Sequence, residues 1–232
     1  MKKSQVTADI GKNRLLFKFS DRVTRKDLES LYTDVRFCVA DLKPGFHVIN
    51  DLSECRLGSL NSIATFRKIM NYLMEMKAGK VIRITRPNSL LHKQIINFSA
   101  RKQGYKPMYV TSLEEAEKIL EESDGQELAL RFQLPQTLAH FSTATLNGTG
   151  HIREISLDHC SIVFFSSTLS VNEEILVKLE FVLRDGTSQL FEIGSRITDV
   201  EAESFTAEFL GLEEQRRQLL WKCIVHEAQK DL

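Results

Sequence analysis

The residue types that could perform metal chemistry are present in this sequence, but their spacing does not favour it. His151 and His159 are eight positions apart and flank an expected strand, and no third zinc ligand accompanies them. Four cysteines are spread along the chain without a C-x-x-C pair, at Cys38, Cys55, Cys160 and Cys223. The sequence therefore predicts no metal site and no disulfide framework, with the thiols reduced and mostly buried.

Motifs for phosphate binding and nucleophilic catalysis are also missing. Gly148 and Gly150 form only a G-x-G in an expected turn, not the longer glycine-rich loop that cradles phosphates. No G-x-S-x-G elbow supports a serine nucleophile, although catalytic residues that meet only in space leave no such motif. Asp51 ends an expected strand, where α/β sheets carry sites, but an Asp there also caps the next loop. We therefore expect a non-enzymatic regulatory or interaction protein, with an unrecognised hydrolase as an alternative.

The first half of the chain alternates strand and helix patterns. The apolar runs predict strands at 15–19, 46–52, 81–85 and 108–111. Capping residues and helical spacing of apolar residues predict helices at about 24–39, 60–76, 88–102 and 112–122. Strands separated by helices of about a dozen residues favour a mainly parallel sheet with crossover helices.

The second half contains strand patterns in close succession. They lie at 134–144, 150–155, 160–165, 174–183, 189–197 and 205–209, and a final helix is expected at about 213–226. Asp185-Gly186 is a strong hairpin signal between two of these runs. Six strands without helices between them predict a small antiparallel β-barrel with a terminal helix.

The polar stretch 123–127 separates these two patterns. The sequence therefore predicts a two-domain α+β protein with an α/β domain at 1–122, a linker at 123–127 and a β-barrel domain at 128–232. The charge divides in the same way: residues 1–121 contain 22 basic and 13 acidic residues, and residues 122–232 contain 9 and 18. Net charges of +9 and −9 favour two domains of different origin. Such charges would also favour docking of the domains on each other, or on copies in an oligomer.

Nucleic acid and membranes are not expected partners. The basic residues of the first half are dispersed and accompany no nucleic-acid-reading motif. No apolar run approaches the roughly 18 residues that cross a bilayer, and no apolar segment follows the N-terminal lysines as in a signal peptide. The sequence therefore predicts a cytoplasmic protein without membrane insertion, whose partners are other proteins.

One segment of the first half is similar to a known group of regulatory domains. Val48-Ile49-Asn50-Asp51-Leu52-Ser53, together with the order of elements over about 8–121, resembles the STAS/SpoIIAA-like group. In its anti-sigma-antagonist members, a kinase phosphorylates a serine at the start of the next helix, in an Asp-Ser-Ser-Gly-like stretch. The corresponding stretch 58–63 lacks the Asp and the paired Ser, which leaves Ser59 or Ser62 as the phosphorylation candidates. The alternative is that these serines only cap the helix.

The second half resembles a PilZ domain over about 126–226. The segment Gly150 to Ile162 is similar to the PilZ strand that carries Asp/Asn-x-Ser-x-x-Gly. The segments Arg131 to Pro135 and Ala207 to Leu212 resemble the beginning of the first PilZ strand and the end of the domain. The resemblance implies a six-stranded PilZ-type barrel with a terminal helix, and cyclic di-GMP as the ligand class.

The residues that would bind cyclic di-GMP depart from the PilZ pattern. PilZ domains use Arg-x-x-x-Arg and Asp/Asn-x-Ser-x-x-Gly, because guanidinium groups pair with phosphate and with guanine edges. Arg131 and Ser156 match this pattern, but Glu127 replaces the first arginine, Glu154 the Asp/Asn and His159 the glycine. We therefore expect a protein-docking adaptor with a degenerate site. A functional cyclic di-GMP receptor and an anti-sigma-antagonist-like phospho-switch are the alternatives.

Overall fold

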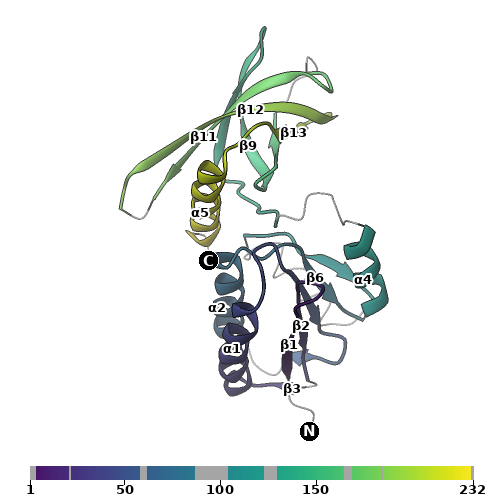
Figure 1. Cartoon of the computed structure of the whole chain (residues 1–232). Coiled ribbons are helices and arrows are strands. Elements are labelled where there is room, and N and C mark those ends of the chain that lie inside the picture. The colour runs from purple at the N-terminus through teal and green to yellow at the C-terminus, as the bar shows by residue number, and fades with distance from the viewer. Residues whose placement is uncertain are drawn as a thin grey trace. The chain divides into compact units, whose positions relative to one another are not determined.

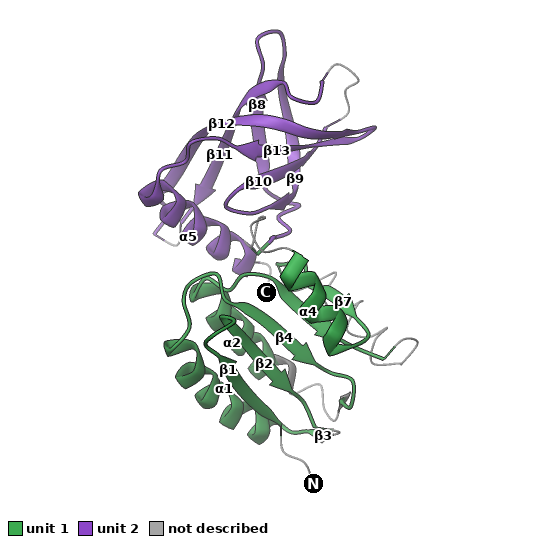
Figure 2. Cartoon of the chain, turned by 45° about the vertical axis from the view of Figure 1, so that its right-hand side comes forward, with its two compact units in different colours: residues 1–130 green, residues 131–232 purple. Residues whose placement is uncertain are grey.

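The computed structural model of the chain describes residues 4–20, 22–57, 62–86, 104–122, 130–164, 169–183 and 185–230. The chain forms two compact units, residues 1–130 and 131–232 (Figure 2). The predicted linker at 123–127 and the predicted helix at 88–102 lie outside the described residues. The domain boundaries drawn from the sequence therefore stay predictions.

The first unit contains a five-stranded mixed sheet. Its order is β1 (Gln5–Asp9), β2 (Arg14–Lys18), β4 (His47–Asp51), β6 (Val81–Ile84) and β7 (Met108–Val110). β1 is antiparallel to β2, and the remaining neighbours are parallel. The predicted parallel strands are thus confirmed, but β1 was not predicted, because Gln5–Asp9 has no apolar run. A separate parallel pair, β3 (Arg22–Val23) and β5 (Arg56–Leu57), was also not predicted.

Helices cover both faces of this sheet. Figure 1 shows α1 (Arg25–Ala40) and α2 (Ser62–Glu75) on one side and α4 (Leu113–Glu122) on the other. α1 begins with a capping box at the predicted start of the helix. The Thr24 hydroxyl accepts from the Asp27 N–H at 3.2 Å, and the Asp27 carboxylate accepts from the Thr24 N–H at 2.9 Å. α4 packs through its buried Ala116 and Leu120 against a cluster of sheet residues, Ile49, Ile82, Ile84 and Val110.

The second unit is a closed barrel of six antiparallel strands, as predicted. The strands are β8 (Leu138–Ser142), β9 (Asn147–Ile155), β10 (His159–Val163), β11 (Glu174–Val182), β12 (Ser188–Glu201) and β13 (Ser204–Phe209). They close in the order β10-β13-β12-β11-β8-β9, and α5 (Glu214–Lys230) follows the last strand (Figure 1). Alternating apolar residues fill the interior, for example Ile175, Val177, Leu179 and Phe181 of β11.

The two glycines of the G-x-G correct one expectation. Gly148 and Gly150 lie inside β9, not in a turn. A Cβ on Gly148 would come within 2.3 Å of the Phe141 ring, and one on Gly150 within 2.3 Å of the Val163 carbonyl oxygen. These positions require glycine because neighbouring strands of the barrel pack closely against the backbone.

Among the helices that the structure describes, none combines the length and the apolar character needed to cross a lipid bilayer.

Candidate functional site

A β-bulge in β9 shapes the outer surface of the barrel. Glu154 is in register with Ser161 of β10, but Ile152 is in register with Ile162, so Arg153 is an extra residue in β9. Strict alternation would send Arg153 and Glu154 to opposite faces of the sheet. The bulge lets both side chains point outward, while Ile152 and Ile155 remain in the core at 0% and 1% exposure.

The turn after β9 is closed by Ser156. The Ser156 hydroxyl oxygen accepts from the N–H of Asp158 at 3.1 Å and from the N–H of His159 at 3.0 Å. The Ser156 N–H donates to the His159 carbonyl oxygen at 2.8 Å. Ser156 is buried, at 1% exposure. Its hydroxyl therefore has a structural role that would arise with or without a ligand.

The same turn is tied to the elements beside it. The Arg217 guanidinium of α5 donates to the Asp158 carboxylate at 2.5 Å. The Asp158 carbonyl oxygen accepts from the Phe209 N–H at the end of β13, at 2.7 Å. The turn is therefore bonded both to the terminal helix and to the last strand of the barrel.

Two arginines on this surface are each paired with a carboxylate. Arg131 Nη1 lies 3.8 Å from Glu154 Oε2, and the Glu154 side chain is only 13% exposed. Arg153 Nη1 lies 2.8 Å from Glu201 Oε2, and Arg153 Nη2 donates to the Ser161 hydroxyl at 3.0 Å. The hydrogen bond from Arg153 holds the pKa of the Glu201 carboxyl below its usual range, as does a second one from Ser204. The Glu201 carboxylate is therefore ionised at neutral pH.

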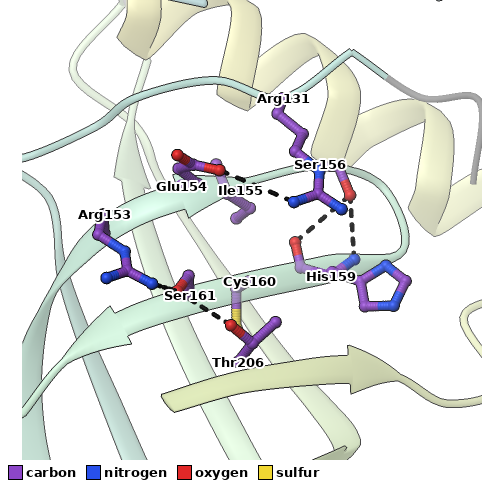
Figure 3. Close-up of a pocket in the computed structure, with 9 residues that line it drawn as sticks. All are labelled: Arg131, Arg153, Glu154, Ile155, Ser156, His159, Cys160, Ser161 and Thr206. Atoms are coloured by element: carbon purple, nitrogen blue, oxygen red, sulfur yellow. Dashed lines mark hydrogen bonds and ion pairs between the residues drawn. The ribbon is translucent and has the colours of Figure 1, made fainter. Parts of the chain in front are cut away.

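These side chains surround a shallow pocket of about 60 Å³ (Figure 3). Arg131 and Glu154 lie along one side of it, and Arg153 and the His159 ring lie near opposite ends. The Ser161 and Thr206 hydroxyls, 3.1 Å apart, form its floor on the neighbouring strands. Pockets for small ligands usually enclose about 300–1,000 Å³, so the present pocket is much smaller than a dinucleotide needs.

The structure brings together all four residues that the sequence proposes for the ligand site. Arg131, Glu154, Ser156 and His159 all line this pocket. Sequence reasoning did not name Arg153 as a site residue, because the PilZ-like pattern was matched only at Arg131, Glu154, Ser156 and His159. The spacing of Ile152 and Ile155, three positions instead of two, was a usable indication of the bulge.

Other candidate residues lie elsewhere. Ser59, like Glu127, is outside the described residues, and Ser62 is the first residue of α2. The Asp51 carboxylate accepts from the N–H of Ser53 at 3.0 Å and from its hydroxyl at 2.6 Å. Asp51 therefore caps the loop that follows β4. This is the structural role that the sequence offered as an alternative to a role in a site.

The cysteines and histidines form no metal-binding cluster in the described part of the chain. No group of three or more potential metal ligands occurs there. All four cysteines are free thiols. Burial in the barrel interior raises the pKa of the Cys160 thiol to about 12, so this thiol is not a nucleophile at neutral pH.

No known protein family and no curated protein matches this chain. Parts of it resemble solved structures. The inhibitor of motility MotI/DgrA of Bacillus subtilis matches with a TM-score of 0.35 and 12% identity, over 40% of this chain and 48% of that one. The PilZ domain of CeSA from a cellulose-synthesizing bacterium matches with a TM-score of 0.33 and 14% identity, over 40% of this chain and 93% of that one.

A third likeness is to the K. pneumonia MrkH–c-di-GMP complex, with a TM-score of 0.32 and 20% identity, over 44% of this chain and 52% of that one. The matched regions thus span about half the length of MotI/DgrA and of MrkH. Because all three TM-scores are below 0.5, these likenesses establish neither a family nor a ligand for this chain.

Proposed function

We propose that this chain is a non-catalytic signalling protein of the PilZ type that acts in the cytoplasm by docking to other proteins. In this proposal, residues 128–232 are a PilZ-like barrel with a degenerate cyclic di-GMP site, and residues 1–122 are a STAS-like docking domain. One observation carries the proposal. Both arginines at the outer pocket face carboxylates of the chain itself, Arg131 facing Glu154 and Arg153 facing Glu201.

The carboxylates oppose a phosphate ligand through charge. Cyclic di-GMP carries two negative charges, and each would lie beside Glu154 or Glu201 when it reached the arginines. Glu154 has the larger effect, because its side chain is 13% exposed while that of Glu201 is 54% exposed, and water screens an exposed charge. The proposal therefore expects binding only in the millimolar range, or none.

The direct test is isothermal titration of the full chain with cyclic di-GMP up to about 1 mM, where we expect no saturable heat. Arg131→Ala and Arg153→Ala are compared with Arg196→Ala, whose arginine pairs with Glu174 outside the pocket. Micromolar binding that is lost in the first two variants and kept in the third would overturn the proposal. It would make the chain a cyclic di-GMP receptor.

That receptor is the second candidate function. It is favoured by the bulge in β9, which turns Arg153 onto the same outer surface as Arg131 and supplies a second guanidinium near the pocket. A third candidate, the phospho-switch, is favoured by the position of Ser62 at the start of α2, where added negative charge is stabilised by the helix dipole. Incubation with a cognate kinase, followed by mass mapping of Ser59 and Ser62, tests that candidate.

A further inference from the structure

A groove between α1 and α2 lies in the first unit and is larger than the pocket on the barrel. Its volume is about 450 Å³, within the range of about 300–1,000 Å³ that is usual for small-ligand sites. Three residues from each helix line it: Arg25, Glu29 and Tyr32 of α1, and Ala64, Thr65 and Lys68 of α2. All six belong to the N-terminal half of their helix.

Both helices begin at the same end of the sheet. The chain passes through α1 between β2 and β4, and through α2 between β4 and β6, and both of these strand pairs are parallel. Each helix therefore starts near the carboxyl ends of the strands, which is the end where parallel sheets usually bind ligands. A helix N-terminus carries about half an elementary positive charge, so both helices add positive potential to the groove.

The Lys68 ammonium crosses the groove from α2 to α1. Its Nζ lies 4.4 Å from the centroid of the Tyr32 ring, and the edge-on Tyr72 ring supports Tyr32 at a centroid distance of 5.9 Å. Within the described residues, Lys68 forms no ion pair with a carboxylate. An aromatic face compensates a positive charge only in part, so Lys68 remains able to bind an anion.

Arg25 supplies a second cation on the opposite side of the groove. Its Nε lies 2.8 Å from Glu29 Oε1, whereas Nη1 and Nη2 bind no other residue in the described part of the chain. The two side chains are 72% and 53% exposed, so the ion pair is weak and accessible to a ligand.

We propose that this groove binds an organic phosphomonoester through Arg25 and Lys68. These two cations and Glu29 leave one net positive charge, and the two helix N-termini add about one more. A phosphomonoester is a dianion above its second pKa of about 6 and matches this charge. The two Nη groups of Arg25 would donate to phosphate oxygens on one side, and the Lys68 ammonium would donate on the other.

The size of the groove requires an organic group on the phosphate. A bare phosphate ion would fill only a small part of 450 Å³, which leaves space beside the small side chains of Ala64 and Thr65. A sugar phosphate and a phosphoserine side chain both present the required chemistry, and the test separates them. The inference concerns the first unit alone and does not depend on the proposed function.

The test is isothermal titration of the full chain with ribose 5-phosphate and with a short phosphoserine peptide, at about pH 7.5 and constant ionic strength. We expect saturable binding of at least one probe, and the tighter probe identifies the source of the phosphate group. Ribose and the unphosphorylated peptide should not bind. Inorganic phosphate should bind at least about tenfold more weakly than the tighter probe, because it leaves the groove mostly empty.

Three variants test the roles of the charges. Lys68→Met should weaken binding by about tenfold or more, the effect of removing a hydrogen bond from a charged group. Glu29→Gln should tighten binding by about two- to fivefold, because it removes an exposed negative charge beside Arg25. Lys26→Met is the matched control and should leave binding unchanged, because Lys26 is an exposed lysine of α1 that does not line the groove.

Four results would overturn the proposal. The first is the absence of saturable binding of either probe up to about 10 mM. The second is equal loss in Lys26→Met and Lys68→Met, which would show general attraction to a basic unit. The third is equal affinity for inorganic phosphate. The fourth is binding that is lost in Arg131→Ala or Arg153→Ala, because the ligand would then occupy the barrel pocket.

Discussion

Gly148 lies at a point of close packing inside the barrel, and a single methyl group tests this packing. The residue opposite Gly148 on β8 is Phe141, whose ring would be 2.3 Å from an added Cβ. That ring cannot move away easily, because it packs edge-on against Phe164 and Phe205 at centroid distances of 4.7 and 4.9 Å. The absence of a side chain at Gly148 is therefore a requirement of the core.

We expect Gly148→Ala to lower the free energy of unfolding of the barrel by about 1–3 kcal/mol, the usual cost of overpacking a core. Gly194→Ala is the control, because Gly194 is also a strand glycine but has nothing within 4 Å of an added Cβ. Chemical denaturation of both variants measures the difference. Equal stability of the two would show that the barrel core tolerates the methyl group and that its packing is looser than described.

At the scale of elements, α4 is held to the sheet by a charged contact at the start of β2. Glu117 of α4 lies 2.8 Å from Lys12 Nζ and forms an ion pair with Arg14, whose side chain is 6% exposed. Burial works to raise the pKa of the Glu117 carboxyl, but the hydrogen bonds and charges of Lys12 and Arg14 outweigh it, and the pKa lies below its usual range. The ionised form of Glu117 therefore stabilises the folded unit.

The sign of this shift predicts a pH dependence. A carboxyl whose pKa is lower in the folded state stabilises the protein above its ordinary pKa, about 4.3, and this stabilisation is lost as pH falls below it. We expect Glu117→Gln to reduce the free energy of unfolding by about 1–3 kcal/mol at pH 7, and the difference to shrink as the pH falls from about 4.3 through the lower folded-state pKa. Denaturant unfolding of both proteins across this range measures the effect.

The exposed pair of Lys118 and Glu122 provides the control on the same helix. These side chains are 74% and 66% exposed, so Glu122→Gln should change stability by less than about 1 kcal/mol. If Glu117→Gln and Glu122→Gln were equally mild at pH 7, the contact of α4 with β2 would contribute no more than a surface ion pair.

The elements also show what the sequence pattern can and cannot predict. Long apolar runs and capping residues identified β4, β6, α1 and all six barrel strands, because each of these signals is local. β1 was missed, since its five residues Gln5–Asp9 are mostly polar and their pairing with β2 depends on residues farther along the chain. The bulge at Arg153 was missed for a similar reason, because it appears only in the register between β9 and β10.

At the scale of the whole molecule, the proposed function is that of a signalling protein whose barrel does not bind cyclic di-GMP tightly. The resemblance identified four residues of the pocket, but the sequence did not indicate which charged side chains pair with each other there. Neither the approach of Arg131 to Glu154 nor that of Arg153 to Glu201 follows from spacing, since Glu201 is 48 residues from Arg153. The proposal depends on these two ion pairs, because they place the chain's own negative charges beside the guanidinium groups that a phosphate of cyclic di-GMP would approach.

The most direct test of this claim is to neutralise both carboxylates and titrate with cyclic di-GMP. In Glu154→Gln/Glu201→Gln the guanidinium groups keep their positions and neutral amides replace the charges. We predict that this variant binds cyclic di-GMP at least about tenfold more tightly than the native chain, which corresponds to about 1.4 kcal/mol of removed repulsion. Micromolar binding by the native chain, with no gain in the double variant, would contradict the account.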